Sequence, residues 1–211
     1  DKRVQSNQVD AKLDYWNILN KKSNINLTLG TILSHQQFDS NIFQYLDNQT
    51  QISPTPSIAN GAATNDIAYR FSDLYLGFHY RLKSGKFTFT PGVAAHGYAI
   101  SNMQTGVKTT DNFFRFLPDM NVIFQIKKSE TLNLNYRMQT QFTDVSKFAS
   151  GLVLNNYNSL FSGSPDLQSA LSHNINLTYY SFNMFNYTNV FANINYNKSI
   201  DNVRNVSAFV P

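Results

Sequence analysis

The chain has 211 residues, a formal net charge of +4, no cysteine and only 14% charged residues, against roughly 25% in ordinary globular domains. The missing cysteines exclude a disulfide scaffold and a thiolate metal site. The positive charge has no clustered source that would indicate nucleic-acid binding, since the lysine pairs at 21–22 and 127–128 fall in expected tight turns.

Aromatic residues reach 14%, which suggests that part of the surface faces something other than water. The mean hydropathy is nevertheless −0.34, and no apolar run approaches the roughly 18 residues of a membrane-spanning helix. Apolar lipid-facing residues that alternate with polar inward-facing ones would reconcile the two facts, as in a transmembrane β-barrel.

Alternation of apolar and polar residues predicts a first β-hairpin near the amino terminus, since a period of two places successive side chains on opposite faces of a strand. The apolar positions of its first strand are Val9, Ala11, Leu13 and Tyr15. After a turn at 20–24, the alternation restarts at Ile25. The stretch 35–66 is rich in Gln, Asn, Ser and Thr and has no sustained period, so we expect a long loop there.

A second hairpin is predicted around a compact turn at 83–86. The apolar positions of its two strands are Leu74, Leu76, Phe78, Tyr80 and Leu82, then Phe87, Phe89, Val93, Ala95 and Ala99. Asp73, His79 and His96 fall on the polar faces and are expected to point into a barrel lumen, where a polar wall explains them better than a metal site. Pro91 cannot donate to a ladder, so we expect a local bulge.

A medium loop at 101–111 is expected before an aromatic cluster at 113–116, of the kind that lies at membrane interfaces. A central hairpin follows, with its turn at 127–130. After a polar stretch at 143–168, alternation resumes at Leu171, turns at 183–186 and continues to Tyr196. The polar faces of these strands are rich in asparagine and fit a hydrated wall; the residues are Asn121, Asn133, Asn135, Asn174, Asn176, Asn193 and Asn195.

The predicted connections run short, long, short, medium, short, long, short. Outer-membrane barrels sort their connections in this way, with brief periplasmic turns and long outer loops, whereas soluble β-sandwiches, the alternative, rarely do. We therefore expect an all-β, transmembrane, antiparallel up-and-down β-barrel. If the turn at 20–24 is periplasmic, both ends of these 211 residues lie on the extracellular side. Complete bacterial barrels of this kind are expected to begin and end in the periplasm instead. Residues 1–211 are therefore expected to be part of one outer-membrane β-barrel domain, about eight strands of a larger barrel.

Several short motifs occur in order across the central third of the chain. They are Leu-Pro-Asp at 117–119, Leu-Asn-Leu-Asn-Tyr-Arg at 132–137, Gly-Ser-Pro-Asp-Leu at 163–167, and Ser-His-Asn at 172–174 followed by Tyr179. This order resembles the outer-membrane TonB-dependent receptor barrels of the Bacteroidetes type. The sequence departs from their pattern at 168–170, where Gln-Ser-Ala replaces Lys-Pro-Glu, and it lacks the Arg-Pro usual after the tyrosine strand.

The resemblance implies a receptor of about 22 strands with an N-terminal plug, which takes up a nutrient across the cell outer membrane with energy from the inner membrane. Its implied partners are outer-membrane lipid, the plug domain and TonB; a surface lipoprotein or other complex partner is a further candidate, and no nucleic acid is expected. Nucleotide, nucleophile and zinc motifs are absent, so neither a cofactor nor enzymatic activity is expected. The alternative is a structural or assembly subunit barrel of an outer-membrane complex without transport activity.

Aromatic residues in the expected outer loops at 35–66, 101–111 and 143–168 are the candidate ligand contacts. Their rings suit stacking against a glycan or a siderophore, although packing of the loops against one another is the other interpretation. The candidates are Phe38, Phe43, Tyr45, Phe148, Tyr157 and Phe161. Asp39 with His35, and Asp144 with Ser146, lie in the same rim loops, but nothing in the sequence fixes their geometry, so they do not predict catalysis.

Overall fold

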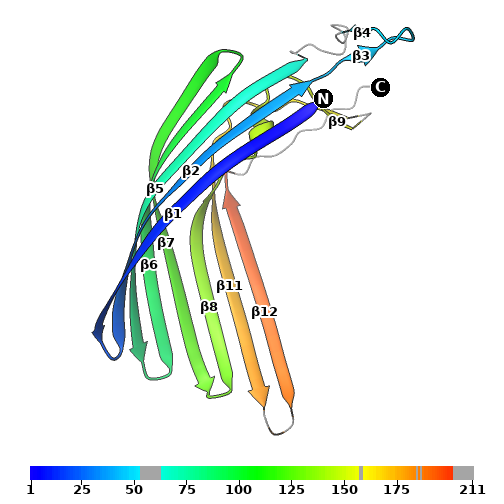
Figure 1. Ribbon diagram of the computed structural model, residues 1–211. Helices are drawn as coiled ribbons and strands as arrows, with labels where there is room; N and C mark the ends of the chain where they lie inside the picture. The colour runs from blue at the N-terminus through cyan, green and yellow to red at the C-terminus, as the bar shows by residue number, and fades with distance from the viewer. Residues whose placement is uncertain (53–62, 157–158, 184, 186, 202–211) are drawn as a thin grey trace.

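The computed structural model describes residues 1–52, 63–156, 159–183, 185 and 187–201. Eight long strands form one antiparallel sheet in which they follow one another in chain order (Figure 1). Their bounds are β1 (Lys2–Asn20), β2 (Ser23–Asn41), β5 (Thr64–Ser84), β6 (Phe87–Gln104), β7 (Val107–Lys127), β8 (Glu130–Gln141), β11 (Ala170–Asn183) and β12 (Thr188–Ile200). The predicted all-β, up-and-down antiparallel architecture is confirmed.

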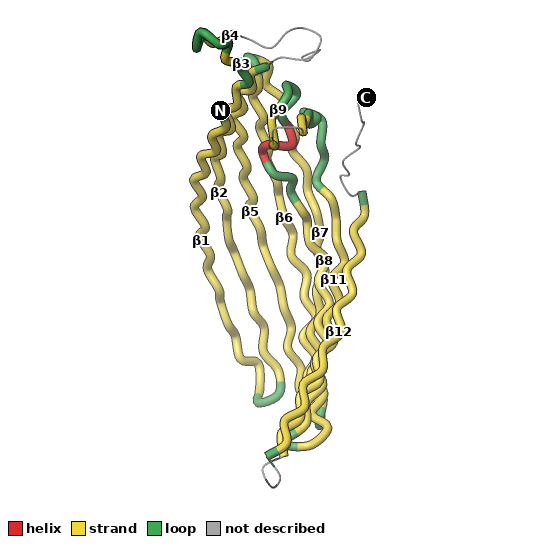
Figure 2. Tube along the Cα trace, turned by 90° about the vertical axis from the view of Figure 1, so that its right-hand side faces the viewer, coloured by secondary structure: helices red, strands yellow, loops and turns green. Residues whose placement is uncertain are grey.

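The sheet is bent into a trough that stays open between its edge strands. In the described part of the chain, β1 and β12 each pair with one neighbour and not with each other, and Figures 1 and 2 show that the sheet is strongly curved. One cavity is lined by Lys12 of β1 and Thr28 of β2 together with Arg137 and Gln139 of β8. Strands so far apart in the sheet share a cavity only because the sheet bends, so these side chains lie on its concave, inner face.

Period-two alternation gives the inner and outer faces opposite chemistry. On β5, the outward Leu74, Leu76 and Phe78 are 59%, 56% and 42% exposed, whereas the inward Asp73 is buried. Side chains converge on the concave side of a bent sheet and diverge on the convex side, which explains why the polar face is the more enclosed one. This arrangement confirms the predicted polar interior.

The connections alternate in length as predicted, with one exception. Tight turns join the strands at 21–22, 85–86 and 128–129. The loop expected at 101–111 is wrong, because β6 runs to Gln104 and β7 begins at Val107. Thr105 (φ 50°) and Gly106 (φ 81°) form the turn, and two residues with positive φ are the hallmark of a type I′ hairpin, whose twist matches the flanking strands.

The expected loop at 35–66 is also shorter than predicted. Pairing between β2 and β5 continues through His35↔Arg70 to Asn41↔Thr64, so Phe38 lies in a strand. Between Asn41 and Thr64 the structure describes two short strands, β3 (Gln44–Tyr45) and β4 (Gln51–Ile52). On β2 most side chains of both faces are polar at this end, so the hydropathy loses its period although the backbone ladder continues. On β5 the apolar residues Ile67, Tyr69 and Phe71 lie on the inner face, opposite to the outward Leu74 and Leu76.

The bulge expected at Pro91 is wrong. The β5–β6 pairs His79↔Gly92 and Leu82↔Phe89 share one register, and β6–β7 pairing runs straight through Pro91↔Met120. Pairing with β5 is interrupted at Pro91 and its neighbour. The proline therefore removes local ladder bonds without inserting an extra residue.

The sheet divides between β7 and β8 in its upper half. Their pairing stops at Asp119↔Arg137, whereas β6 and β7 stay paired to Gln104↔Val107. Arg115 of β7 spans the gap by donating from Nη2 to the carbonyl and hydroxyl oxygens of Ser169, at 3.3 and 3.1 Å. The chain that leaves β8 turns to the inner side, where Phe142 packs edge-on against Phe71 of β5 and Tyr98 of β6, with ring centroids 4.4 and 5.2 Å apart.

The connection at 142–169 packs against the inner face. It contains a 3-10 helix, η1 (Val145–Phe148), and the short strands β9 (Val153–Asn156) and β10 (Ser159–Phe161). Phe148 stacks on Tyr69 of β5 with ring centroids 5.3 Å apart. The buried cluster that holds the connection consists of Phe38, Ile67, Tyr69, Val145, Phe148, Ala149 and Val153. Asn65 adds polar anchors, donating to the Leu152 carbonyl at 3.1 Å and accepting from the Gly151 amide at 2.8 Å.

Phe148→Ala is expected to release the 142–169 connection from the inner face while the eight-stranded sheet persists. The change removes the ring that stacks on Tyr69 and leaves a cavity in a buried cluster, and such Phe→Ala changes cost about 3–5 kcal/mol. Limited proteolysis of the folded protein should show faster cleavage within residues 142–169. Leu160→Ala, which truncates a side chain that is 44% exposed in the same connection, is the control and should keep the parent rate. Equal cleavage of Phe148→Ala and the parent would contradict this packing.

Candidate functional site

The inner face is a polar wall whose side chains meet in rows across the strands. Directly paired residues of neighbouring strands point to the same face, so the pairing register identifies each row. One row runs from β2 to β12 through Asn26, His79, Gly92, Asp119, Arg137, Asn174 and Asn197. Apart from Gly92, every residue of this row carries a side chain that can form hydrogen bonds, so the row is polar from one side of the trough to the other.

His79 and Asp119 meet across a glycine in this row. They lie on β5 and β7, separated by β6, yet His79 Nε2 is 3.0 and 3.1 Å from the two carboxylate oxygens. The contact exists because Gly92 has no side chain: a Cβ there would lie 2.2 Å from His79 Cδ2 and 2.7 Å from Asp119 Oδ1. The glycine therefore allows a polar pair to span three strands.

A second pair lies higher on the same wall. His96 Nδ1 is 2.9 and 3.0 Å from the carboxylate oxygens of Asp73, and both side chains are more enclosed than those of the first pair. Tyr75 and Tyr98 stack on the imidazole, with centroid distances of 5.1 and 5.4 Å. The ring is thereby held in one orientation on both faces and at its Nδ1.

The two histidines do not converge on one centre. As predicted, His79, His96 and Asp73 all face the hollow, but each histidine has its own carboxylate. Among the described residues, no group of three or more His, Cys, Asp or Glu side chains could hold a metal ion. A cavity of about 660 Å³ lies against both pairs and extends to Lys12 and Arg137.

Asparagines form a hydrogen-bonded lattice on the rest of the wall. Asn121 Nδ2 donates to Asn133 Oδ1 at 2.7 Å and to Asn135 Oδ1 at 2.5 Å. On β11 and β12, Asn176 donates to Asn195, and Asn195 donates in turn to Asn193. An amide side chain carries both donors and acceptors, so a continuous lattice of them presents a wall that exchanges hydrogen bonds with water or a polar solute.

The 142–169 connection and the β6–β7 hairpin enclose a second cavity of about 300 Å³ at the mouth of the trough. Pro165, Asp166 and Leu167 of the Gly-Ser-Pro-Asp-Leu motif line it, opposite Tyr69 and Asn102. Gly163 of the same motif has a separate role. A Cβ there would lie 1.8 Å from the Lys147 carbonyl oxygen, so only glycine lets the backbone approach η1 this closely.

The six candidate ligand contacts do not gather at one site. Phe38 and Phe148 are buried in the cluster beneath the connection and expose 0% and 6% of their surface; their observed role is packing. Phe161 is partly buried against the same cluster. Phe43 and Tyr45 form an edge-on ring pair 5.3 Å apart, and Tyr45 is 68% exposed. Tyr157 lies outside the described residues.

Asp144 and Ser146 make a structural cap. The Asp144 carboxylate accepts from the Ser146 amide at 2.8 Å and from its hydroxyl at 2.6 Å, at the start of η1. These hydrogen bonds favour the ionised carboxylate, and the one from the Ser146 hydroxyl contributes most to lowering the pKa of Asp144. His35 and Asp39 both lie on β2, and pairing puts them opposite Arg70 and Asp66 of β5.

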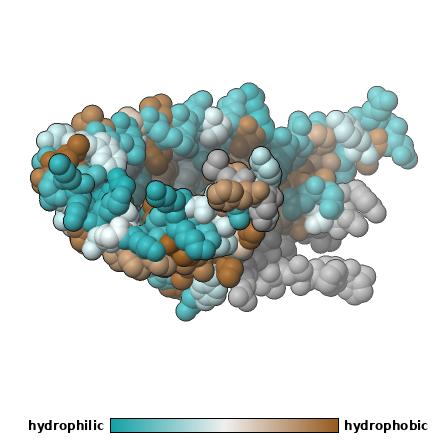
Figure 3. All heavy atoms as spheres, turned by 90° about the horizontal axis from the view of Figure 1, so that it is seen from below, coloured by the Kyte–Doolittle hydropathy of each residue, from teal (hydrophilic) through white to brown (hydrophobic). Residues whose placement is uncertain are grey.

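The outer face carries a broad apolar band. Phe114 and Phe116 of β7 are 60% and 66% exposed, and Ile194 of β12 is 65% exposed. The expected aromatic cluster at 113–116 is divided by strand alternation, since Arg115 lies over the inward Phe113 ring at 4.9 Å. From Phe114 to Phe124 the band spans about 33 Å of strand, or roughly 25 Å of height at a tilt near 40°. Figure 3 shows hydrophilic residues over much of the turn end, with hydrophobic ones at its margins.

This height equals the apolar band of outer-membrane barrels, about 25 Å. No helix in the part of the chain that the structure describes is long and apolar enough to cross a membrane. A monomer in water does not expose so large an apolar surface, so lipid is the cover that fits the outer face.

Comparison with known proteins supports this assignment. No curated protein matches the chain. The family model described as "Outer membrane protein beta-barrel family" matches residues 1–209, which include all the strands described above. The apolar outer face therefore faces membrane lipid. From its sequence match and its polar-inside, apolar-outside sheet, the chain belongs to the outer membrane protein beta-barrel family and is located in the outer membrane.

Proposed function

We propose that the chain is a barrel segment of a TonB-dependent receptor that takes up a nutrient across the outer membrane. The observation that carries this proposal is the open trough, whose interior holds a folded connection and a polar cavity of about 660 Å³. An eight-stranded barrel closed on itself is just wide enough to be filled by its own side chains. A connection that packs inside the sheet, in addition to such a cavity, favours a wider barrel.

The edge strands support the same view. In lipid, every backbone N–H and C=O group needs a partner within the protein, and one side of both β1 and β12 has no partner strand among the described residues. Additional strands between these edges would satisfy both sides and widen the lumen. A receptor of about 22 strands with a plug in its lumen meets this requirement.

The inner wall suits contact with a plug or a passing polar solute. Its ionisable groups are largely paired within the wall, as in His79–Asp119 and His96–Asp73, so it is polar with few unpaired charges that would hold a solute tightly. The asparagine lattice offers donors and acceptors along the upper part of β11 and β12, from Ser172 to Thr178 and from Asn193 to Ser199. At the outer end, Phe43 and Tyr45 remain our proposed ligand contacts, because Tyr45 keeps most of its surface free.

Disulfide trapping tests whether the eight strands close on themselves. The chain has no cysteine, so any disulfide within it must form between the two cysteines that are introduced. We expect no cross-link when Lys12→Cys of β1 is combined in turn with Asn193→Cys, Asn195→Cys and Asn197→Cys of β12. Thr178→Cys with Asn193→Cys is the positive control, because these residues pair directly.

Non-reducing electrophoresis of the protein in outer membranes gives the readout. A β1–β12 cross-link as efficient as the Thr178–Asn193 control would mean a self-closed eight-stranded barrel and would sink the wide-receptor proposal. A cross-link in the control alone supports strands inserted between the two edges.

A binding experiment separates the receptor from a structural barrel. The whole polypeptide that contains this chain, purified from outer membranes, is expected to have a mass well above 24.0 kDa and to bind the periplasmic domain of TonB. Binding should vanish when the segment preceding the plug is deleted, since TonB engages its receptors there. A large polypeptide that shows no TonB binding would favour a structural or assembly subunit without transport activity.

A further inference from the structure

A row of polar side chains crosses the outer face at the upper boundary of the apolar band. Pairing aligns its members on five adjacent strands: Asn7, His35, Arg70, Ser101 and Thr110. The next row toward the turns is Val9, Leu33, Ser72, Ala99 and Asn112. Below that lie the large apolar residues Leu74 and Phe114. The polar row is thus the first level at which charge appears above the band.

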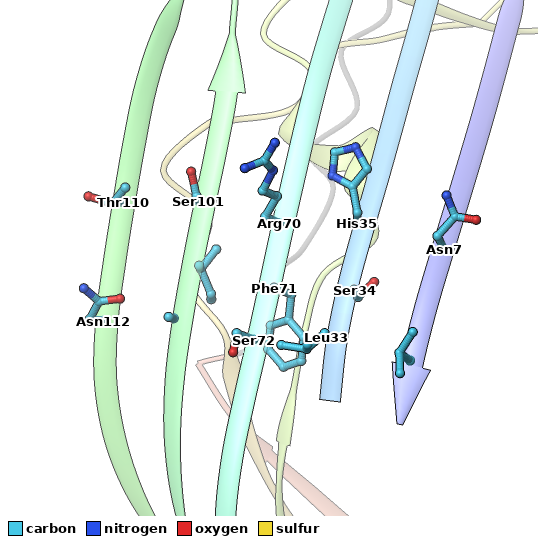
Figure 4. A pocket seen from close by; sticks show the side chains of 13 residues that line it. Asn7, Leu33, Ser34, His35, Arg70, Phe71, Ser72, Ser101, Thr110 and Asn112 are labelled. Carbon is cyan, nitrogen blue, oxygen red and sulfur yellow. The ribbon is translucent and has the colours of Figure 1, made fainter. Parts of the chain in front are cut away.

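These two rows enclose a groove of about 630 Å³ whose surface is mostly apolar. Small side chains form its middle, where Ser72, Ala99 and Ser101 lie side by side on β5 and β6. In Figure 4, Arg70 lies on the middle strand of the five and His35 on the next, with Asn7 at one side of the groove and Thr110 and Asn112 at the other. Directly below the groove, Leu74 and Phe114 of the apolar band follow Ser72 and Asn112 on the same face of β5 and β7.

Arg70 and His35 offer unused hydrogen-bond donors at its upper edge. They are directly opposed on β5 and β2, a position in which Cβ atoms are about 5 Å apart. Neither side chain makes a hydrogen bond or an ion pair with another residue in the described ranges. The carboxylates on this face of the same strands, Asp39 and Asp66, lie about 13 Å further along. An anion between Arg70 and His35 would therefore meet donors on both sides.

The level of the groove indicates what kind of anion reaches it. The Arg70 row is two residues above Val9 and Leu33 and, on β7, four residues above Phe114, or about 5–10 Å in height for a tilted strand. The headgroup zone of a bilayer extends roughly 5–7 Å beyond the hydrocarbon core. The long connections mark this end as the extracellular one, so the groove faces the headgroups of the outer leaflet.

We propose that this groove binds a phosphate-bearing lipid of the outer leaflet. The Arg70 guanidinium and the His35 ring donate to the phosphate oxygens, and an acyl chain descends over Ser72 and Ala99 into the apolar band. Guanidinium suits phosphate because its N–H groups match two oxygens at once. The occupant is a lipid rather than a free anion because most of the groove is apolar and continuous with the lipid-facing band. The site depends on membrane location and not on transport.

Lipid binding to the whole detergent-solubilised protein, measured by native mass spectrometry, tests the proposal. The probes are phosphatidylglycerol, a glycosyl diacylglycerol with the same acyl chains but no phosphate, and inorganic phosphate. We expect phosphatidylglycerol to bind best. Arg70→Gln should weaken it roughly tenfold, the loss expected for a charge-assisted hydrogen bond. Ala99→Leu should weaken it as well, by filling the groove without altering its charge.

Arg81→Gln is the matched control. It makes the same substitution on the same strand, but Arg81 lies near the turn end and on the inner face, where it is opposite Asn24. The Arg81→Gln variant should therefore bind phosphatidylglycerol like the parent. Heat-modifiable electrophoretic mobility confirms that each variant is folded. The proposal is overturned if Arg70→Gln or Ala99→Leu binds like the parent, or if Arg81→Gln weakens binding equally. It is also overturned if the phosphate-free lipid or inorganic phosphate binds as tightly as phosphatidylglycerol, or if no probe binds.

Discussion

Backbone pairing is the constraint on which this structure depends, because a strand that crosses lipid must satisfy its N–H and C=O groups within the protein. In the part of the chain that the structure describes, the six central strands of the sheet have a neighbour on each side, while β1 and β12 have one each. The same ladder sets the strand order and the level of every side chain. The polar rows of the inner wall, the outer apolar band and the groove beside Arg70 are all consequences of its register.

Small residues decide how the interior is used. Gly92 lets His79 reach Asp119 across an intervening strand, and Gly163 lets the 142–169 connection lie against η1. Apolar packing then holds that connection inside the trough, with Phe148 on Tyr69 as its centre. The rings of Phe38 and Phe148 are therefore buried in this packing and are not free to stack on a solute. Our proposed ligand contacts are correspondingly restricted to the exposed part of the outer end.

The inner face of the sheet meets water, and the outer face meets lipid. Charged side chains therefore have different surroundings on the two faces, above all at the upper boundary of the apolar band. On the inner face, both histidines are paired with carboxylates, His79 with Asp119 and His96 with Asp73. On the outer face, Arg70 and His35 stand together just above the band without an ion-pair partner among the described residues. An unpaired cation at a lipid boundary is accounted for most simply by an anionic headgroup.

The sequence by itself determined the strand class, the strand count and the faces, because alternation at positions such as Leu74 to Leu82 is a local property of the chain. It was sufficient to place His79, His96 and Asp73 on the interior. It missed the tight turn at Thr105–Gly106 and the outer half of β2, where two largely polar faces leave no hydropathy period. It also missed the start of β5, where the apolar side chains lie on the inner face instead of the outer one. Only the tertiary structure decided that Phe38 and Phe148 are buried, that His79 has Asp119 as its partner, and that Arg70 stands beside His35. Those contacts join residues far apart in the chain, and they depend on register and on the bend of the sheet, which a local pattern does not encode.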